Sequence, residues 1–398
     1  MNRKSLFKKT RCGAVLPLVV LIVLLLMVIG LGVTSLGMHS RLFAIHSADS
    51  ITARSATDAA VSDAIFEMNE KLKVKPWNDS SLPAASDVAL LNSDATYDYV
   101  VTENNDIYTV EGTGRALNHV HTINSALRLS SFFDYALFTR GTIELKNCSN
   151  VGWINNHPDD WPLQVGTMST ASNAVTLMNS SVVNGDVLVG VGGDPDVVIN
   201  GKTGAIITGD TYPLTYPVQL HPVVVPDVVK ALPLGATIND PLTITVSGKY
   251  PKIDLGNSEA LTISGNVTLY ITGDVKMGNS AVININPGSS LVMYVGGNFD
   301  GSNSAGFNNL TANAQNLGLY CLSTCKQVLF KNSSNFYGAI YAPDAAITLD
   351  NTADVYGSIV GNSFILKNSG KLMYDAAFRH RSVDDIGVRF AISRWSEQ

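Results

Sequence analysis

"NSSNFYGAIYA" (residues 332–342) and "NTADVYGSIVG" (residues 351–361) carry one pattern in two consecutive copies, and this repeat decides the fold. The copies agree at a tyrosine, a glycine and an isoleucine. A shorter version, an apolar residue followed by a variable residue, an asparagine and a small residue, recurs at Asn147, Asn179, Asn257, Asn279, Asn332, Asn351 and Asn368. Periods of about 20 residues that contain short strands are typical of solenoids.

The residues between these asparagines alternate between apolar and polar, which predicts strands with an apolar interior face. Examples of the expected interior residues are Leu261, Ile263, Val267, Leu269 and Ile271. Asparagine tolerates left-handed backbone geometry at tight turns, and stacked asparagine amides can hydrogen-bond to one another. We therefore expect a mainly β protein, a right-handed parallel β-helix over residues 131–378. The alternative is a β-sandwich with coincidental turn asparagines.

A proline-rich segment, residues 211–233, interrupts the repeats. Proline lacks the N–H that a central strand donates, so we expect an extended crossing loop outside the coils.

The N-terminus has a different character, since "RCGAVLPLVVLIVLLLMVIG" (residues 11–30) follows a basic leader. No charge occurs from Ala14 to Val33, which is about the 20 residues that a helix needs to span a bilayer. This run is longer than the apolar core of a signal peptide, and no cleavage site of that class follows it closely. The basic flank predicts one span with the N-terminus in the cytoplasm.

Residues 40–73 contain neither proline nor glycine, so the helix should continue beyond the span. Ala56, Ala60 and Ala64 lie on one face, and such small-residue stripes let helices approach closely. Pro76 should end a helix that begins near Leu16 and reaches Val74. The expected organisation is a leader (1–13), this helix (14–75), a linker (76–96), a β subdomain packed on the helix (97–130), the β-helix (131–378) and a C-terminal tail (379–398) that caps it.

The leader, the glycine, the apolar run and the alanine-rich extension together resemble the N-termini of type IV pilins and pseudopilins. The resemblance implies that prepilin peptidase cleaves after Gly13, that Ala14 becomes the N-terminus, and that the helix packs against other pilin-like subunits. Major pilins carry glutamate at the fifth mature position, where this chain has Leu18. PilX-type minor pilins and K-type pseudopilins also lack it, which favours a minor or initiating role. A plain signal anchor is the alternative.

The body also resembles a known family. "YITGDVKMGNSAVININPGSSLVMYVGGNF" (residues 270–299), the two repeats quoted first and the closing "LMYDAAF" (residues 372–378) resemble a β-helical domain of unknown function that follows PilX-like N-termini in bacteria. The resemblance covers roughly residues 100–378. It implies a role in pilus assembly or at the cell surface and supplies no catalytic residues.

Charge and residue type argue against several other functions. The net charge of -6 does not suit a nucleic-acid partner. Asp274, Asp300, Asp350 and Asp354 are scattered and each lies beside a turn, so we expect no paired acid and base, no enzyme and no cofactor. The stretch at 300–309 faintly resembles a calcium loop but lacks its spaced carboxylates, and we expect an ordinary loop.

Histidines and cysteines offer the remaining candidate sites. His119 and His121 share one face of a strand, but no third ligand is identifiable nearby, so we expect a solvated face and no metal. Cys321 and Cys325 can form a local disulfide in an oxidising compartment. Cys148 is the only other cysteine beyond the span, too few for a four-ligand zinc site.

These observations predict a bacterial, non-enzymatic, pilin-like protein. It would be anchored once in the inner membrane, with its C-terminal domain periplasmic or extracellular, as a minor subunit or assembly factor of a type IV pilus-like or pseudopilus system. The alternatives are an anchored adhesin, a carbohydrate-binding β-helix with a surface ligand, or a polysaccharide-degrading enzyme, which would need a cleft of clustered carboxylates.

Overall fold

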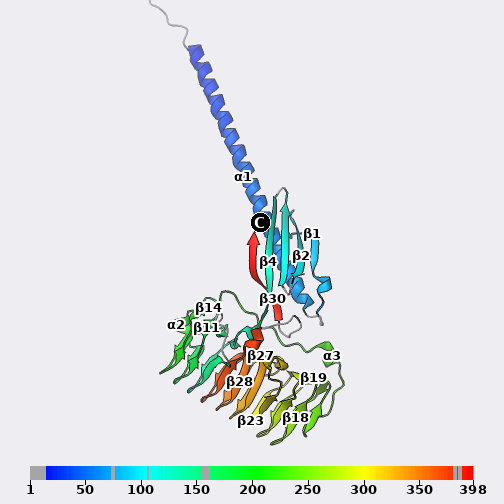
Figure 1. The fold of residues 1–398 in the computed structure, drawn as a ribbon. Coiled ribbons are helices and arrows are strands. Elements are labelled where there is room, and N and C mark those ends of the chain that lie inside the picture. Colours follow the sequence, from blue (N-terminus) through cyan, green and yellow to red (C-terminus); the bar gives the residue numbers. More distant parts are fainter. Residues whose placement is uncertain are drawn as a thin grey trace, which may run out of the picture. The chain divides into compact units, whose positions relative to one another are not determined.

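The chain divides into two compact units, Met1–Leu129 with Arg389–Gln398, and Ser130–Val388. The computed structural model describes residues 15–72, 77–104, 107–117, 119–154, 162–379, 383 and 388–397. The first unit holds a long helix and a small antiparallel sheet, and the second holds a large parallel sheet (Figure 1).

The first unit is built on helix α1 (Val15–Lys71), which is 57 residues long. At 1.5 Å per residue its length is about 85 Å. The helix expected from near Leu16 to Val74 is confirmed as far as Lys71, and residues 73–76 lie outside the described part of the chain. Pro17 is tolerated because it stands in the first turn, where its missing N–H leaves no helical hydrogen bond broken.

A five-stranded antiparallel sheet packs on the second half of α1. Its strands, in spatial order, are β1 (Ala84–Ala89), β2 (Thr96–Asn104), β3 (Ile107–Ala116), β4 (His119–Ser131) and β30 (Val388–Glu397), and the 3-10 turn η1 (Asp79–Ser81) precedes them. The sheet expected over 97–130 is present as β2, β3 and β4, which pair antiparallel in sequence order.

Two strands of this sheet come from segments that we expected to have other roles. The stretch 76–96, expected as a linker, contributes β1, an edge strand with a register shift between Ala85 and Val88. The tail 379–398, expected to cap the β-helix, instead contributes β30, which lies beside β4 at the other edge. Neither segment alternates clearly between buried and exposed residues, because an edge strand buries little of either face.

The second unit contains a 21-stranded sheet of short, parallel strands. They are β5 (Leu137–Thr139), β6 (Ile143–Leu145), β7 (Asn150–Trp153), β8 (Gln164–Thr167), β9 (Val175–Leu177), β10 (Val182–Val183), β11 (Asp186–Val189), β12 (Ile199–Gly201), β13 (Ile206–Ile207), β14 (Thr211–Pro213), β16 (Gly248–Tyr250), β17 (Ile253–Leu255), β19 (Asn266–Ile271), β20 (Val275–Met277), β22 (Ser290–Val295), β23 (Phe299–Asn303), β25 (Leu317–Cys321), β26 (Gln327–Lys331), β27 (Asn335–Asp350), β28 (Asp354–Leu366) and β29 (Lys371–Tyr374).

A second parallel sheet in this unit has four strands, β15 (Leu242–Ile244), β18 (Ala260–Ile263), β21 (Val282–Ile285) and β24 (Gly306–Asn309). The short helical elements are η2 (Phe132–Asp134), α2 (Pro195–Val198), α3 (Asp227–Lys230), η3 (Ala314–Asn316) and η4 (Ala376–Arg379). The stretch 300–309, expected as a loop, lies largely in β23 and β24.

Equivalent residues of neighbouring repeats are paired in register on adjacent strands. Tyr337 pairs with Tyr356, and Tyr270 pairs with Tyr294. The residues expected inside, Leu261, Ile263, Val267, Leu269 and Ile271, are all buried. The alternation in the sequence therefore identified this part of the apolar core correctly.

The strands do not stack in chain order. The run 248–374 ends at β28 and β29, and there it pairs with β5, β6 and β7, which begin the earlier run 137–213. The two runs therefore join into one continuous stack, with β14 near one end and β16 near the other.

The proline-rich segment connects these two ends. The Arg140 guanidinium donates a hydrogen bond to the Leu220 carbonyl oxygen at 2.8 Å. The Tyr341 hydroxyl donates one to the His221 carbonyl oxygen, also at 2.8 Å. The expectation of a crossing segment outside the strands applies to residues 214–233, whereas residues 211–213 form β14. Among the register pairs of the described residues, that strand pairs with β11, a position at the edge where proline is tolerated.

Asparagine side chains link successive strands across the junction between the two runs. Asn147, Asn179, Asn351 and Asn368 all have left-handed backbone, with φ of 48°, 38°, 41° and 46°. The amide of Asn179 donates to the Asn147 carbonyl oxygen at 2.9 Å, Asn147 donates to Asn368 at 2.8 Å, and Asn368 donates to Asn351. The predicted asparagine ladder is therefore present here.

At two other repeats the same motif is built differently. The left-handed residue beside Asn257 and Asn279 is the following serine, Ser258 or Ser280. The link between these turns is a hydrogen bond from the Asn279 backbone N–H to the Asn257 side-chain oxygen, at 2.8 Å.

Candidate functional site in helix α1

The first half of α1 presents apolar side chains to its surroundings on every side. Leu21, Leu25 and Leu26 are each more than half exposed. A helix that is apolar all round is stable only where lipid or other protein covers it. Among the described residues, α1 is the helix long and apolar enough to cross a membrane, although a signal sequence has the same length and composition.

One face of the second half of α1 is covered by the sheet of its own unit. Ala53, Ala56, Ala60 and Ala64 recur every third or fourth residue and are fully buried, with Met68 continuing the stripe. The small residues expected to contact other helices therefore contact this sheet instead. Burial of the stripe leaves the opposite face of this half exposed, as at Phe66, whose side chain is more than half exposed.

Two glycines of β3 allow the close approach of helix and sheet. A Cβ atom at Gly114 would lie 2.5 Å from the Thr57 backbone nitrogen and 2.7 Å from its hydroxyl oxygen. The Thr57 hydroxyl donates to the carbonyl oxygens of Ala53 (2.9 Å) and His121 (3.0 Å), so it also ties the helix to β4. At Gly112 a Cβ atom would meet side-chain atoms of Val61 and Ala60 at 3.0 and 3.3 Å.

An amide clamp fixes the C-terminal strand to α1. The Asn69 side chain accepts from the Phe390 backbone N–H at 2.8 Å and donates to the Phe390 carbonyl oxygen at 3.2 Å. The Phe390 ring packs among Trp77 and Tyr108. The Tyr108 hydroxyl donates to Asp79 at 2.7 Å, and burial together with this bond raises the pKa of Tyr108. No local pattern of residues signals this clamp, because Asn69 and Phe390 are 321 residues apart in the chain.

The residues singled out in the sequence fall in different places. Gly13 and Ala14 lie outside the described residues. Cys321 and Cys325 are buried free thiols with a hydrogen bond between them, so the disulfide remains a prediction. That bond and burial raise the pKa of Cys321, whereas the same bond lowers the pKa of Cys325. His119 faces His46 of α1, a neighbour that sequence spacing could not reveal.

The acidic residues of the repeats mostly support neighbouring strands. Asp274 accepts from the Asn298 backbone N–H, and Asp354 accepts from that of Lys371, both at 2.9 Å. Asp300 and Asp350 form ion pairs with Lys331 (3.1 Å) and Lys367 (3.4 Å). We expected these residues only to form turns, and the links to neighbouring strands are an addition from the structure.

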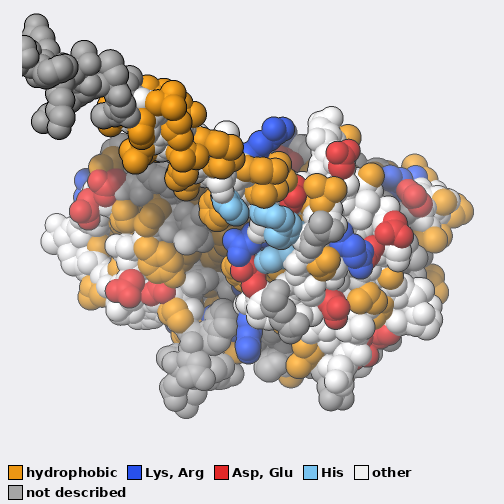
Figure 2. Space-filling model, turned by 90° about the horizontal axis from the view of Figure 1, so that it is seen from above, with side chains coloured by type: hydrophobic (Ala, Val, Ile, Leu, Met, Phe, Trp, Pro, Cys, Tyr) orange, Lys and Arg blue, Asp and Glu red, His pale blue; other side chains and the backbone are white. Residues whose placement is uncertain are grey.

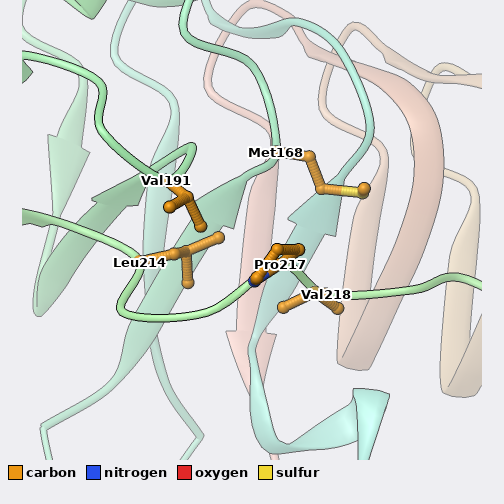
Figure 3. Close-up of a pocket in the computed structure, with 5 residues that line it drawn as sticks. All are labelled: Met168, Val191, Leu214, Pro217 and Val218. Atoms are coloured by element: carbon orange, nitrogen blue, oxygen red, sulfur yellow. The ribbon is translucent and has the colours of Figure 1, made fainter.

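A small hollow in the second unit is lined by Met168, Val191, Leu214, Pro217 and Val218 (Figure 3). All five side chains are apolar, so the lining offers no side-chain group that could orient or activate a substrate. We assign it no role in chemistry.

Comparison with known proteins gives two findings. A domain of unknown function (DUF7305) matches residues 230–381, less than half of the chain. The crystal structure of competence-associated pilin ComZ from Thermus thermophilus is similar with a TM-score of 0.34 and 10% identity, covering 88% of this chain and 97% of that one. At that score we draw no conclusion from the likeness. No curated protein matches the chain by sequence.

Proposed function

We propose that this chain is a non-enzymatic, pilin-like subunit whose helix α1 holds it in the membrane and then packs with other pilin-like subunits. The proposal rests on the difference in exposure between the two halves of α1. Its first half exposes apolar side chains all round, whereas its second half buries one face against the sheet of its own unit. A soluble domain would gain nothing from an exposed helix of this kind, but an assembling subunit needs one.

The action of such a subunit is mechanical. Near the membrane centre each leucine, isoleucine or valine contributes about 0.3–0.6 kcal/mol to insertion, so the run up to Val33 suffices as an anchor. Prepilin peptidase would cut after Gly13 and leave Ala14 as the N-terminus. Leu18 at the fifth mature position fits a minor subunit or assembly factor better than a major one.

We further propose that the parallel strands of the second unit wind into a β-helix that is displayed outside the membrane. Three parallel series support this winding, and each passes from one repeat to the next: β16 to β19 to β22, β17 to β20 to β23, and β15 to β18 to β21. The asparagine ladder provides a further link between the repeats.

Processing by prepilin peptidase tests the proposed function. We would express the full chain with and without the enzyme, extract it in detergent and read its N-terminus by mass spectrometry. We expect Ala14 at the N-terminus when the peptidase is present, and an uncut chain for Gly13→Val. Gly30→Ala is the matched control, because the space beside Gly30 is open, and it should be cut like the natural chain. An intact Met1 with active peptidase would favour a plain signal anchor and contradict the proposal.

A further inference from the structure

Three potential metal ligands meet where α1 leaves its sheet. His46 and Asp49 lie three residues apart on α1, and His119 is the first residue of β4. One ligand atom from each of the three lies within 4.8 Å of the other two. Figure 2 shows histidine side chains gathered beside the apolar side chains of the protruding helix.

The geometry points to a binding site for one divalent transition-metal ion, formed by His46, Asp49 and His119. Two imidazole nitrogens and one carboxylate oxygen, with a fourth position open to water, form a donor set typical of Zn²⁺. The inference does not depend on the proposed function, because it concerns only the contact between α1 and its own sheet.

The separation of the two imidazoles supports this assignment. Nδ1 of His46 lies 3.3 Å from Nε2 of His119, and the ring planes are inclined at 68°. Two nitrogens that bind a tetrahedral Zn²⁺ at about 2.0–2.1 Å are about 3.3–3.4 Å apart. The rings therefore already hold their nitrogens at the spacing of a shared ion, and a carboxylate oxygen of Asp49 lies within 4.8 Å of both nitrogens.

The position of the cluster indicates what the ion would do. Ala53 is the first fully buried alanine of the stripe on α1, and His46 lies two turns nearer the N-terminus, where the helix is exposed. An ion shared by His46, Asp49 and His119 would extend the contact between helix and sheet by those two turns. It would bind the folded unit and not the unfolded chain, and so stabilise the folded unit.

A neighbouring histidine, His121, has a different partner. His121, two residues beyond His119 on the same face of β4, has its Nε2 at 3.9 Å from Glu397, and Glu397 also pairs with Arg54. His121 is therefore engaged elsewhere and provides a control, since it matches His119 in residue type and strand.

The test uses the full chain in detergent, carrying a tag without histidine and stripped of metal by a chelator. Zn²⁺ is titrated by calorimetry, and Co²⁺ is used as an optical probe because tetrahedral sites give it intense visible bands. We expect one ion per chain and at least tenfold weaker binding for His46→Gln, Asp49→Asn and His119→Gln. His121→Gln should bind as the natural chain does. Circular dichroism of each variant verifies that it is folded.

Hydrogen exchange provides a second measurement. Zn²⁺ should increase the protection of amides in residues 46–53 and 119–123 of the natural chain and leave the His46→Gln/His119→Gln double variant unchanged. Undiminished Zn²⁺ binding by the double variant would overturn the assignment. Absence of stoichiometric binding by the natural chain would also overturn it, and the two imidazoles would then form only a hydrogen bond.

Discussion

Replacing Gly114 by alanine should loosen the contact between α1 and its sheet. The added Cβ atom would meet the Thr57 nitrogen at 2.5 Å, the Thr57 hydroxyl at 2.7 Å and the carbonyl oxygen of Ala53. Two of these atoms belong to the helix backbone, which cannot rotate out of the way as a side chain can. The helix must therefore retreat from β3 along part of the buried stripe.

The magnitude follows from two opposing effects. Overpacking a tight contact costs about 1–3 kcal/mol, and a clash with backbone belongs at the upper end. Alanine in a strand recovers about 0.5–1 kcal/mol relative to glycine, because the unfolded chain has less freedom to lose. The net loss is about 2 kcal/mol, which corresponds to roughly a 30-fold change in an opening equilibrium.

Hydrogen exchange read by mass spectrometry measures this opening locally. Amides of residues 108–116 and of the facing helix should lose protection about 30-fold in Gly114→Ala. Gly112→Ala is the matched control on the same strand and face. Its Cβ would meet the movable end of Val61 at 3.0 Å, so its protection should change less than threefold. Equal protection in Gly114→Ala and the natural chain would refute the close packing of α1 on β3.

Four further outcomes are expected. Asn69→Ala should lower the stability of the first unit by about 1–3 kcal/mol and speed hydrogen exchange in β30, because both backbone groups of Phe390 lose their partner. Asn69→Asp keeps the acceptor and should lower the stability less. Asn368→Ala should lower the unfolding midpoint of the second unit more than Asn368→Gly, since left-handed backbone costs alanine about 1–2 kcal/mol. The unfolding midpoint of the second unit should stay constant up to about pH 10 and fall toward pH 12. Burial raises the pKa of Tyr294, Tyr337 and Tyr374 to about 12, so the folded state favours their neutral form and loses stability as they ionise. Tyr294→Phe should lessen this fall. In denaturant, protein exported to an oxidising compartment should resist alkylation at Cys321 and Cys325 until it is reduced, whereas Cys148 should react at once.

The sequence predicted the features that depend on local periodicity. Alternating apolar residues identified the interior positions. The repeated tyrosines turn out to be register partners, because neighbouring repeats in this stack are also neighbours in the chain over residues 248–374. The long helix followed from composition alone.

Features that depend on contacts between distant segments could not be predicted. Asn147 follows Asn368 in the ladder although 221 residues separate them, so the order of the stack was invisible to the repeat pattern. The alanine stripe was predicted correctly as a packing face but given the wrong partner, since a stripe of small residues fits a glycine-bearing strand as well as a helix. His46 and His119 are 73 residues apart, and their meeting depends on that same packing.

The proposed function requires the first half of α1 to lie in lipid and the second half to lie outside it, against its own sheet. Spin labels at Leu25 and at Ser55, on a background in which Cys12 and Cys148 are replaced by serine, test it most directly in reconstituted vesicles. The label at position 25 should be relaxed by oxygen and shielded from a water-soluble relaxant, and the label at position 55 should behave in the opposite way. Equal access of the water-soluble relaxant to both labels would contradict it.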